Sequence, residues 1–111
     1  MPRKTIAQKI IIPASTTTKT AIYTVPDAKT FKLKQLCVHF PSGASSNVLV
    51  AAYHGLRKIA PEEGYLSGDN STACSDADEE YTAATEIVIE AVNNQASSIT
   101  IDVTVDGDEE P

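Results

Sequence analysis

Short runs rich in Thr, Val and Ile, separated at regular intervals by Pro and Gly, most strongly limit how this chain can fold. The runs end at Pro13, Pro26, Pro41, Gly55 and Gly107. β-Branched residues favour half-buried strands, and no stretch has the i, i+3, i+4, i+7 apolar spacing of a helix. The pattern therefore predicts an all-β fold, namely a two-sheet antiparallel β-sandwich, jelly-roll-like, with about eight short strands.

Two segments near the C-terminus alternate strictly enough to assign a core face. Successive side chains of a strand point to opposite faces, so every second residue belongs to the same side. The short connection "NNQA" between the two segments predicts that they pair as a terminal hairpin. The core residues predicted in this way are Ile87, Ile89 and Ala91 in the first segment, and Ile99, Ile101, Val103 and Val105 in the second.

The segment "TFKLKQLCVHF", residues 30–40, changes its alternation halfway. Its large apolar residues stand at odd positions up to Leu33 and at even positions from Leu36 onward. A β-bulge, or a bend where the strand passes from one sheet to the other, explains the change and is the favoured interpretation. The alternative is a flat strand that exposes one apolar row as an interface.

The length of 111 residues and the hydrophobic content of 41% predict one domain, residues 1–106. Residues 1–9 are either the first strand or an arm that docks on a neighbouring subunit. Residues 107–111, which are acidic, are predicted to form a flexible tail. The apolar run 10–12 ends at Pro13, too short for a signal-peptide core or a membrane span, so we expect neither a cleaved signal nor membrane association.

Charge is divided unevenly along the chain. Residues 1–58 hold all nine Lys and Arg against one acid, Asp27, for a charge of +8, whereas residues 59–111 hold fourteen acids and no base, for −14. The halves either interleave within one fold, which is the favoured interpretation, or attract one another between copies. The net charge of −6 argues against nonspecific nucleic-acid binding, which requires a basic face.

The two cysteines are too few for a disulfide scaffold. Cys37 falls within a predicted strand, and Cys74 in a stretch, "DNSTACSDADEE", predicted to be a polar loop. Two free thiols are the favoured interpretation, and a single bridge between the strand and the loop is the alternative.

No catalytic motif is present. His39 and His54, the only histidines, lack a nucleophile elbow such as G-x-S-x-G, and we expect structural or solvent-facing roles for both. The two histidines and two cysteines would form a zinc site only through long-range coincidence. Asp76, Asp78 and Glu80 alternate as calcium-loop ligands do, but the glycine and the final bidentate acid are missing, so a solvated acidic segment is favoured over weak divalent binding. No cofactor is expected.

The order of the segments "AIYTVPDAKTFKLKQLCVHF", "VLVAAYHG", "TEIVIEAVN" and "ITIDVTVDG" resembles that of small β-sandwich proteins of tailed phages, archaeal viruses and prophages. The resemblance covers roughly residues 20–106 and consists of a pattern of strands and turns. Similar jelly-roll modules serve as decoration, turret, spike or minor capsid proteins. Some carbohydrate-binding and receptor-binding domains share the pattern.

The resemblance implies a non-enzymatic structural protein of a virion, assembled in the host cytoplasm, that self-associates and docks on a major capsid or other virion protein. The alternative is a module that binds carbohydrate or a host receptor. Association between copies would cover sheet edges that otherwise invite uncontrolled pairing. The predicted interface residues are Arg3, Lys4, Lys9, Lys32, Lys34, Val88 and Val92.

Overall fold

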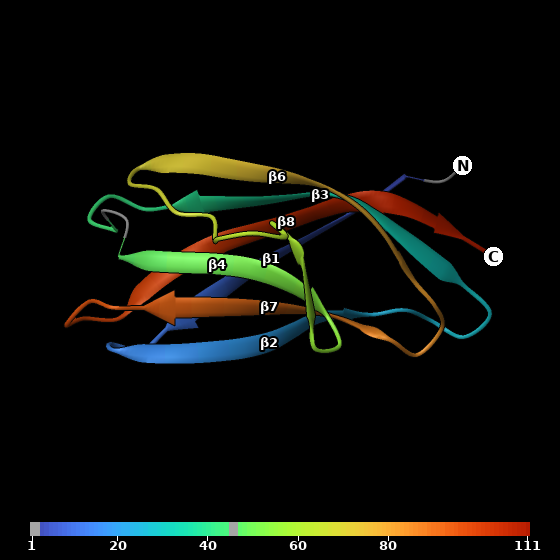
Figure 1. The fold of residues 1–111 in the computed structure, drawn as a ribbon, viewed down its shortest axis with the longest axis horizontal. Helices are drawn as coiled ribbons and strands as arrows, with labels where there is room; N and C mark the ends of the chain where they lie inside the picture. Colours follow the sequence, from blue (N-terminus) through green and yellow to red (C-terminus); the bar gives the residue numbers. More distant parts are fainter. Residues whose placement is uncertain (1–2, 45–46) are drawn as a thin grey trace.

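The structure is a computed structural model that describes residues 3–44 and 47–111. These residues contain eight strands and no helix. The prediction of an all-β sandwich is confirmed (Figure 1). The strands are β1 (Arg3–Ile12), β2 (Thr16–Thr24), β3 (Thr30–Phe40), β4 (Val48–His54), β5 (Arg57–Ala60), β6 (Ser71–Tyr81), β7 (Glu86–Asn93) and β8 (Ile99–Glu110).

The strands form two four-stranded antiparallel sheets that pack face to face. One sheet has the order β1-β8-β3-β6 and the other β2-β7-β4-β5. Within them β1 pairs with β8, β2 with β7, β3 with β6 and β4 with β5, so the chain is one long hairpin that has been rolled up. This nesting is the jelly roll. As a result, β1 begins and β8 ends at the same end of the sandwich (Figure 1).

The predicted core faces are confirmed, but the predicted terminal hairpin is wrong. Ile87, Ile89, Ile101 and Val103 are fully buried between the layers. However, β8 pairs with β1 and β3, while β7 pairs with β2 and β4 in the other sheet. The connection between β7 and β8 therefore crosses from one layer to the other. In the sequence it is only a short polar stretch, which fits such a crossing as well as a hairpin turn.

The side chain of Asn93 holds this crossing in place. It is fully buried, and its Nδ2 donates to the carbonyls of Ile12, Pro13 and Ser97 at 3.1, 3.2 and 3.0 Å. Its Oδ1 accepts the backbone N–H of Gln95 at 2.9 Å. Because a buried amide is tolerated only when its hydrogen bonds are made, Asn93 ties the end of β1 to the β7–β8 connection.

A β-bulge explains the change of alternation in β3. Leu33 is paired with Gly107 and Gln35 with Asp106, so β3 has one residue, Lys34, more than β8 at this point. The extra residue turns the strand over, and Leu33 and Leu36 are both fully buried in the same core. β3 pairs with β8 and β6 on both sides of the bulge, so it does not pass to the second sheet and does not expose an apolar row.

Gly107 lies opposite the bulge and allows the strands to approach closely. A Cβ at this position would lie 2.1 Å from the carbonyl oxygen of Lys32 and 2.8 Å from Cζ of Phe31. The predicted flexible tail is therefore wrong for residues 107–110, which continue β8 and pair with β1 and β3. Acidic composition suggested fraying, but the bases of the neighbouring strands hold the segment.

The N-terminal segment forms a strand rather than an arm. Residues 3–9 belong to β1 and pair with β8 in a continuous register from Arg3↔Asp108 to Ile12↔Ile99. Residues 1 and 2 lie outside the described residues. Lys4 and Lys9 therefore lie in an edge strand of the first sheet and not in an arm that extends to a neighbouring subunit.

The predicted polar loop around Cys74 and the two free thiols are also wrong. Residues 71–80 belong to β6, an edge strand, and Cys74 lies directly opposite Cys37 of β3. The two form a disulfide with their Cα atoms 4.1 Å apart. Cys37 follows the fully buried Leu36, so it faces the outside of the sheet rather than the core. The bond fastens the edge strand to its neighbour across a separation of 37 residues.

Replacing Gly107 by Ala should destabilise the fold, because the new methyl group meets backbone that cannot move without breaking the β3–β8 ladder. We expect a loss of about 1–3 kcal/mol, with a fall in Tm of about 4–8 °C per kcal/mol. Thermal unfolding followed by circular dichroism measures it. Thr104→Ala, on the half-exposed outer face of the same strand, is the matched control. An equal Tm for the two variants would contradict the close approach at the bulge.

Reduction of the Cys37–Cys74 bond should lower the free energy of unfolding by about 3–4 kcal/mol, because the bond limits the conformations of the unfolded chain. Denaturant unfolding with and without a reductant gives the difference. The variant Cys37→Ala/Cys74→Ala should match the reduced wild type and be insensitive to reductant. Two titratable thiols in the native, air-oxidised protein would refute the bond.

Candidate interaction surfaces

The rolled hairpin places strands of the basic half beside strands of the acidic half. β1, β2 and β3 lie next to β8, β7 and β6, so bases and acids far apart in the sequence become neighbours. In the described part of the chain, every Lys or Arg ion pair joins the two halves. The pairs are Arg3–Asp106, Lys4–Glu109, Lys9–Asp102, Lys29–Glu109, Lys32–Glu110, Lys34–Asp78 and Arg57–Glu79. The favoured interpretation, interleaving within one fold, is the one that the structure shows.

One row of charges runs across the outer face of the β1-β8-β3-β6 sheet. Arg3 of β1 lies opposite Asp108 of β8, Asp108 opposite Lys32 of β3, and Lys32 opposite Glu80 of β6. The signs alternate across all four strands. Opposite charges at directly facing positions stabilise a sheet, whereas like charges destabilise it.

The predicted interface bases are thus spread over two strands of a single sheet. Lys9 is exposed and reaches Asp102 at 2.9 Å, and Lys34 projects from the bulge to Asp78 at 3.2 Å. A hollow of about 290 Å³ opens beside the bulge. Its lining is charged or polar apart from glycine, and consists of Arg3, Lys34, Gln35, Asp76, Asp106, Gly107 and Asp108.

Lys4 belongs to a different group, which closes the end of the sandwich around Glu109. The hydroxyl of Tyr23 donates to Glu109, the Nζ of Lys4 lies 3.4 Å from the same carboxylate, and that of Lys29 lies 4.0 Å away. Lys4 also lies over the Tyr23 ring, 4.9 Å from its centroid. The hydrogen bond from Tyr23, together with the two ammonium groups, lowers the pKa of Glu109 despite its partial burial.

Val88 and Val92 lie on the outer face of the second sheet, where both are half-buried. Val88 faces Ala21 and Tyr53, and Val92 faces Thr17 and Leu49 on the flanking strands. These positions form a partly apolar outer surface. Whether it is an interface remains a prediction.

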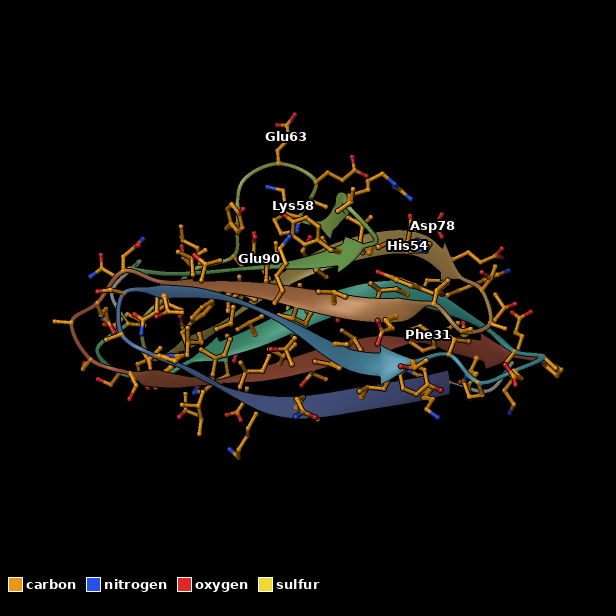
Figure 2. The ribbon with its side chains drawn as sticks, turned by 90° about the horizontal axis from the view of Figure 1, so that it is seen from below. Phe31, His54, Lys58, Glu63, Asp78 and Glu90 are labelled. Carbon is orange, nitrogen blue, oxygen red and sulfur yellow. A yellow bond between two sulfur atoms is a disulfide. The ribbon has the colours of Figure 1, made fainter. Side chains whose placement is uncertain are left out.

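The sequence did not reveal that two tyrosines share one carboxylate on this face. The hydroxyls of Tyr53 and Tyr65 donate to the same oxygen of Glu90 at 3.1 and 2.7 Å, which raises the pKa of Tyr65. Lys58 lies over the Tyr65 ring and donates to the Gly64 carbonyl at 2.5 Å. Figure 2 shows Lys58 near Glu90, and Glu63 at the tip of a loop that projects from the sheet.

The two histidines have structural partners, as expected. His54 Nδ1 lies 2.5 Å from Glu79, which also binds Arg57, and its ring packs against Tyr81 at 4.2 Å between centroids. This group joins β4 and β5 of one sheet to β6 of the other. His39 contacts the Thr72 hydroxyl at 3.1 Å on the outer face of the first sheet.

The acids Asp76, Asp78 and Glu80 lie in a row along exposed positions of β6. Asp76 accepts from Gln35 and Asp78 from Lys34, so two of them are engaged with β3. No group of three or more His, Cys, Asp or Glu side chains that could hold a metal ion occurs among residues 3–44 and 47–111. Nor does this part of the chain contain a helix long and apolar enough to cross a membrane.

No protein-family model matches the chain, and no curated protein matches it by sequence. Solved structures match by fold. A chain of the cyanophage Pam1 capsid aligns with a TM-score of 0.58 and 13% identity over 95% of this chain and 83% of that one. The chain therefore shares its fold with this chain of a viral capsid.

Two further matches show the breadth of this fold. A protein of Sulfolobus Turreted Icosahedral Virus aligns with a TM-score of 0.57 and 16% identity over 97% of this chain, which spans only 29% of the viral protein. The protein FLHE aligns with a TM-score of 0.54 and 8% identity over 96% of this chain and 98% of its own. At these identities the likeness concerns the fold, and function must be argued from the surface.

Glu109→Gln should reduce stability at neutral pH and matter less in acid. Because the folded-state pKa of Glu109 is lowered, its contribution is present above the unfolded-state value of about 4.3 and is lost as the pH falls through the lower folded-state value. The measurement is Tm of variant and wild type from pH 7 to pH 2. Asp102→Asn, which breaks an exposed pair with Lys9, is the control and should change Tm little. A deficit of Glu109→Gln that stays constant across this range would contradict the account.

Proposed function

We propose that this chain is a non-enzymatic structural protein of a virion, which docks on the capsid in a decoration, turret or minor capsid role and associates with copies of itself. The observation that carries the proposal is the match in fold to the Pam1 capsid chain, which covers 95% of this chain and 83% of that one. The likeness in fold thus extends over almost the whole of this chain rather than over one part of it. Assembly would take place in the host cytoplasm, on a major capsid or other virion protein.

The surface supports a role in binding protein rather than in catalysis. Both histidines are engaged in contacts that hold strands together. Lys4, Lys9 and Lys34 form ion pairs with acids of neighbouring strands. The partly apolar outer face of the second sheet, around Val88 and Val92, is a surface on which another protein could pack. With a net charge of −6, nucleic acid is a poor partner.

The outer face of the second sheet also favours a second candidate, a module that binds carbohydrate or a host receptor. Two tyrosine rings and a carboxylate lie together there in Tyr53, Tyr65 and Glu90. Aromatic faces and hydrogen-bond acceptors are what a sugar ring requires. Lys19 and Lys58 lie over these rings, so a sugar would have to displace the lysines to stack.

Co-expression with the major capsid protein of the same genome tests the first candidate. Assembled shells separated on a density gradient should carry the chain at a constant ratio to the capsid protein. An unrelated β-sandwich domain of similar size is the control and should stay at the top of the gradient. If the chain also stays at the top, and binds glycans through Tyr65 on an array, the second candidate replaces the first.

A further inference from the structure

The two open edges of the β1-β8-β3-β6 sheet are matched in length and opposite in charge. β1 has 10 residues and β6 has 11, and neither contains Pro or Gly. β1 carries Arg3, Lys4 and Lys9 and no acid, whereas β6 carries four acids, residues 76 and 78–80, and no base. Within the described residues, no other strand pairs with the outer side of either edge.

We propose that β6 of one copy pairs with β1 of the next, so that the sheet continues from subunit to subunit. The inference deepens the proposed function and rests on its self-association. The alternating row Arg3–Asp108–Lys32–Glu80 begins with a positive charge at one edge and ends with a negative charge at the other. If the next copy is placed without a shift in register, its Arg3 lies beside Glu80 of the first copy. The alternation of positive and negative charges then continues across the junction.

The strand directions agree with this arrangement. β1, β8, β3 and β6 are successively antiparallel, so three reversals leave β6 antiparallel to β1. A neighbour in the same orientation therefore presents an antiparallel β1 to β6, and the ladder of backbone hydrogen bonds continues in the same sense. In this register Lys4 lies at the level of Glu79, because both are aligned through Gly107 and Leu33.

Charge also selects against other pairings of the edges. Two β1 edges repel each other, and so do two β6 edges, so among pairings between the edges of this sheet only the head-to-tail combination is complementary. The second sheet offers no such combination, because its edge strands are both basic: β2 carries Lys19, and β5, only 4 residues long, carries Arg57 and Lys58. A head-to-tail contact of this kind closes into rings or extends into chains.

A charge exchange at the junction tests the inference. Purified wild-type chain should form assemblies larger than a dimer at low salt in mass photometry or sedimentation, and should dissociate at about 1 M NaCl, where the Debye length is about 3 Å. Arg3→Glu and Glu80→Arg should each lower the association constant by at least about tenfold, since each places like charges opposite one another. Lys19→Glu, the same change on an edge of the other sheet, should leave association unchanged.

Mixing the two single variants provides the decisive observation. The charge-reversed β1 edge of the Arg3→Glu variant then faces the charge-reversed β6 edge of the Glu80→Arg variant. At the next junction the unchanged Arg3 faces the unchanged Glu80, so alternating assemblies should reappear in the mixture. A wild type that is monomeric at low salt, or variants that associate like the wild type, would overturn the edge pairing. Binding of the chain to capsid shells is measured separately, so a monomer that still sediments with shells refutes this inference and leaves the capsid role standing.

Discussion

Cross-strand pairing between a basic first half and an acidic second half is the constraint on which the rest of the structure depends. A rolled hairpin sets each early strand beside a late one, so the division of charge along the sequence becomes alternation across the sheets. Each exposed pair contributes only about 0–1 kcal/mol. Their value lies in the choice of partner strand, because pairing two basic or two acidic strands would place like charges opposite one another. Register is set by the core, because a shift of one residue would turn apolar side chains out of it.

Two local devices allow the long strands to keep that register. The bulge at Lys34 brings both halves of β3 onto the same core, and Gly107 lets β8 approach β3 at that point. On the outer face, the Cys37–Cys74 bond fastens the acidic edge strand to the sheet. Glu109 and Asn93 then close the two ends with hydrogen bonds that join distant segments. These contacts join distant segments at both ends of the sandwich and at one of its edges.

The sequence allowed prediction of features that depend on neighbouring residues and failed for those that depend on a distant partner. Alternation identified Ile87 and Ile101 as core residues, and its interruption after Leu33 predicted a bulge or a bend into the other sheet, of which the structure has the bulge. Local polarity wrongly suggested a loop around Cys74 and a flexible end after Gly107, because the strands that order them come from elsewhere in the chain. The shared carboxylate of Tyr53 and Tyr65 likewise arises only when β7 lies beside β4.

The fold links these features to assembly, since a jelly roll leaves two edges on each sheet and this chain gives one sheet edges of opposite charge. The central claim is that the two halves pair strand by strand. Nuclear Overhauser contacts between backbone protons of a labelled sample test it most directly. The account predicts contacts from Ile10 to Ile101 and from Lys19 to Glu90, which are directly opposite in the ladders. Contacts that instead pair β7 with β8 as a hairpin would contradict it.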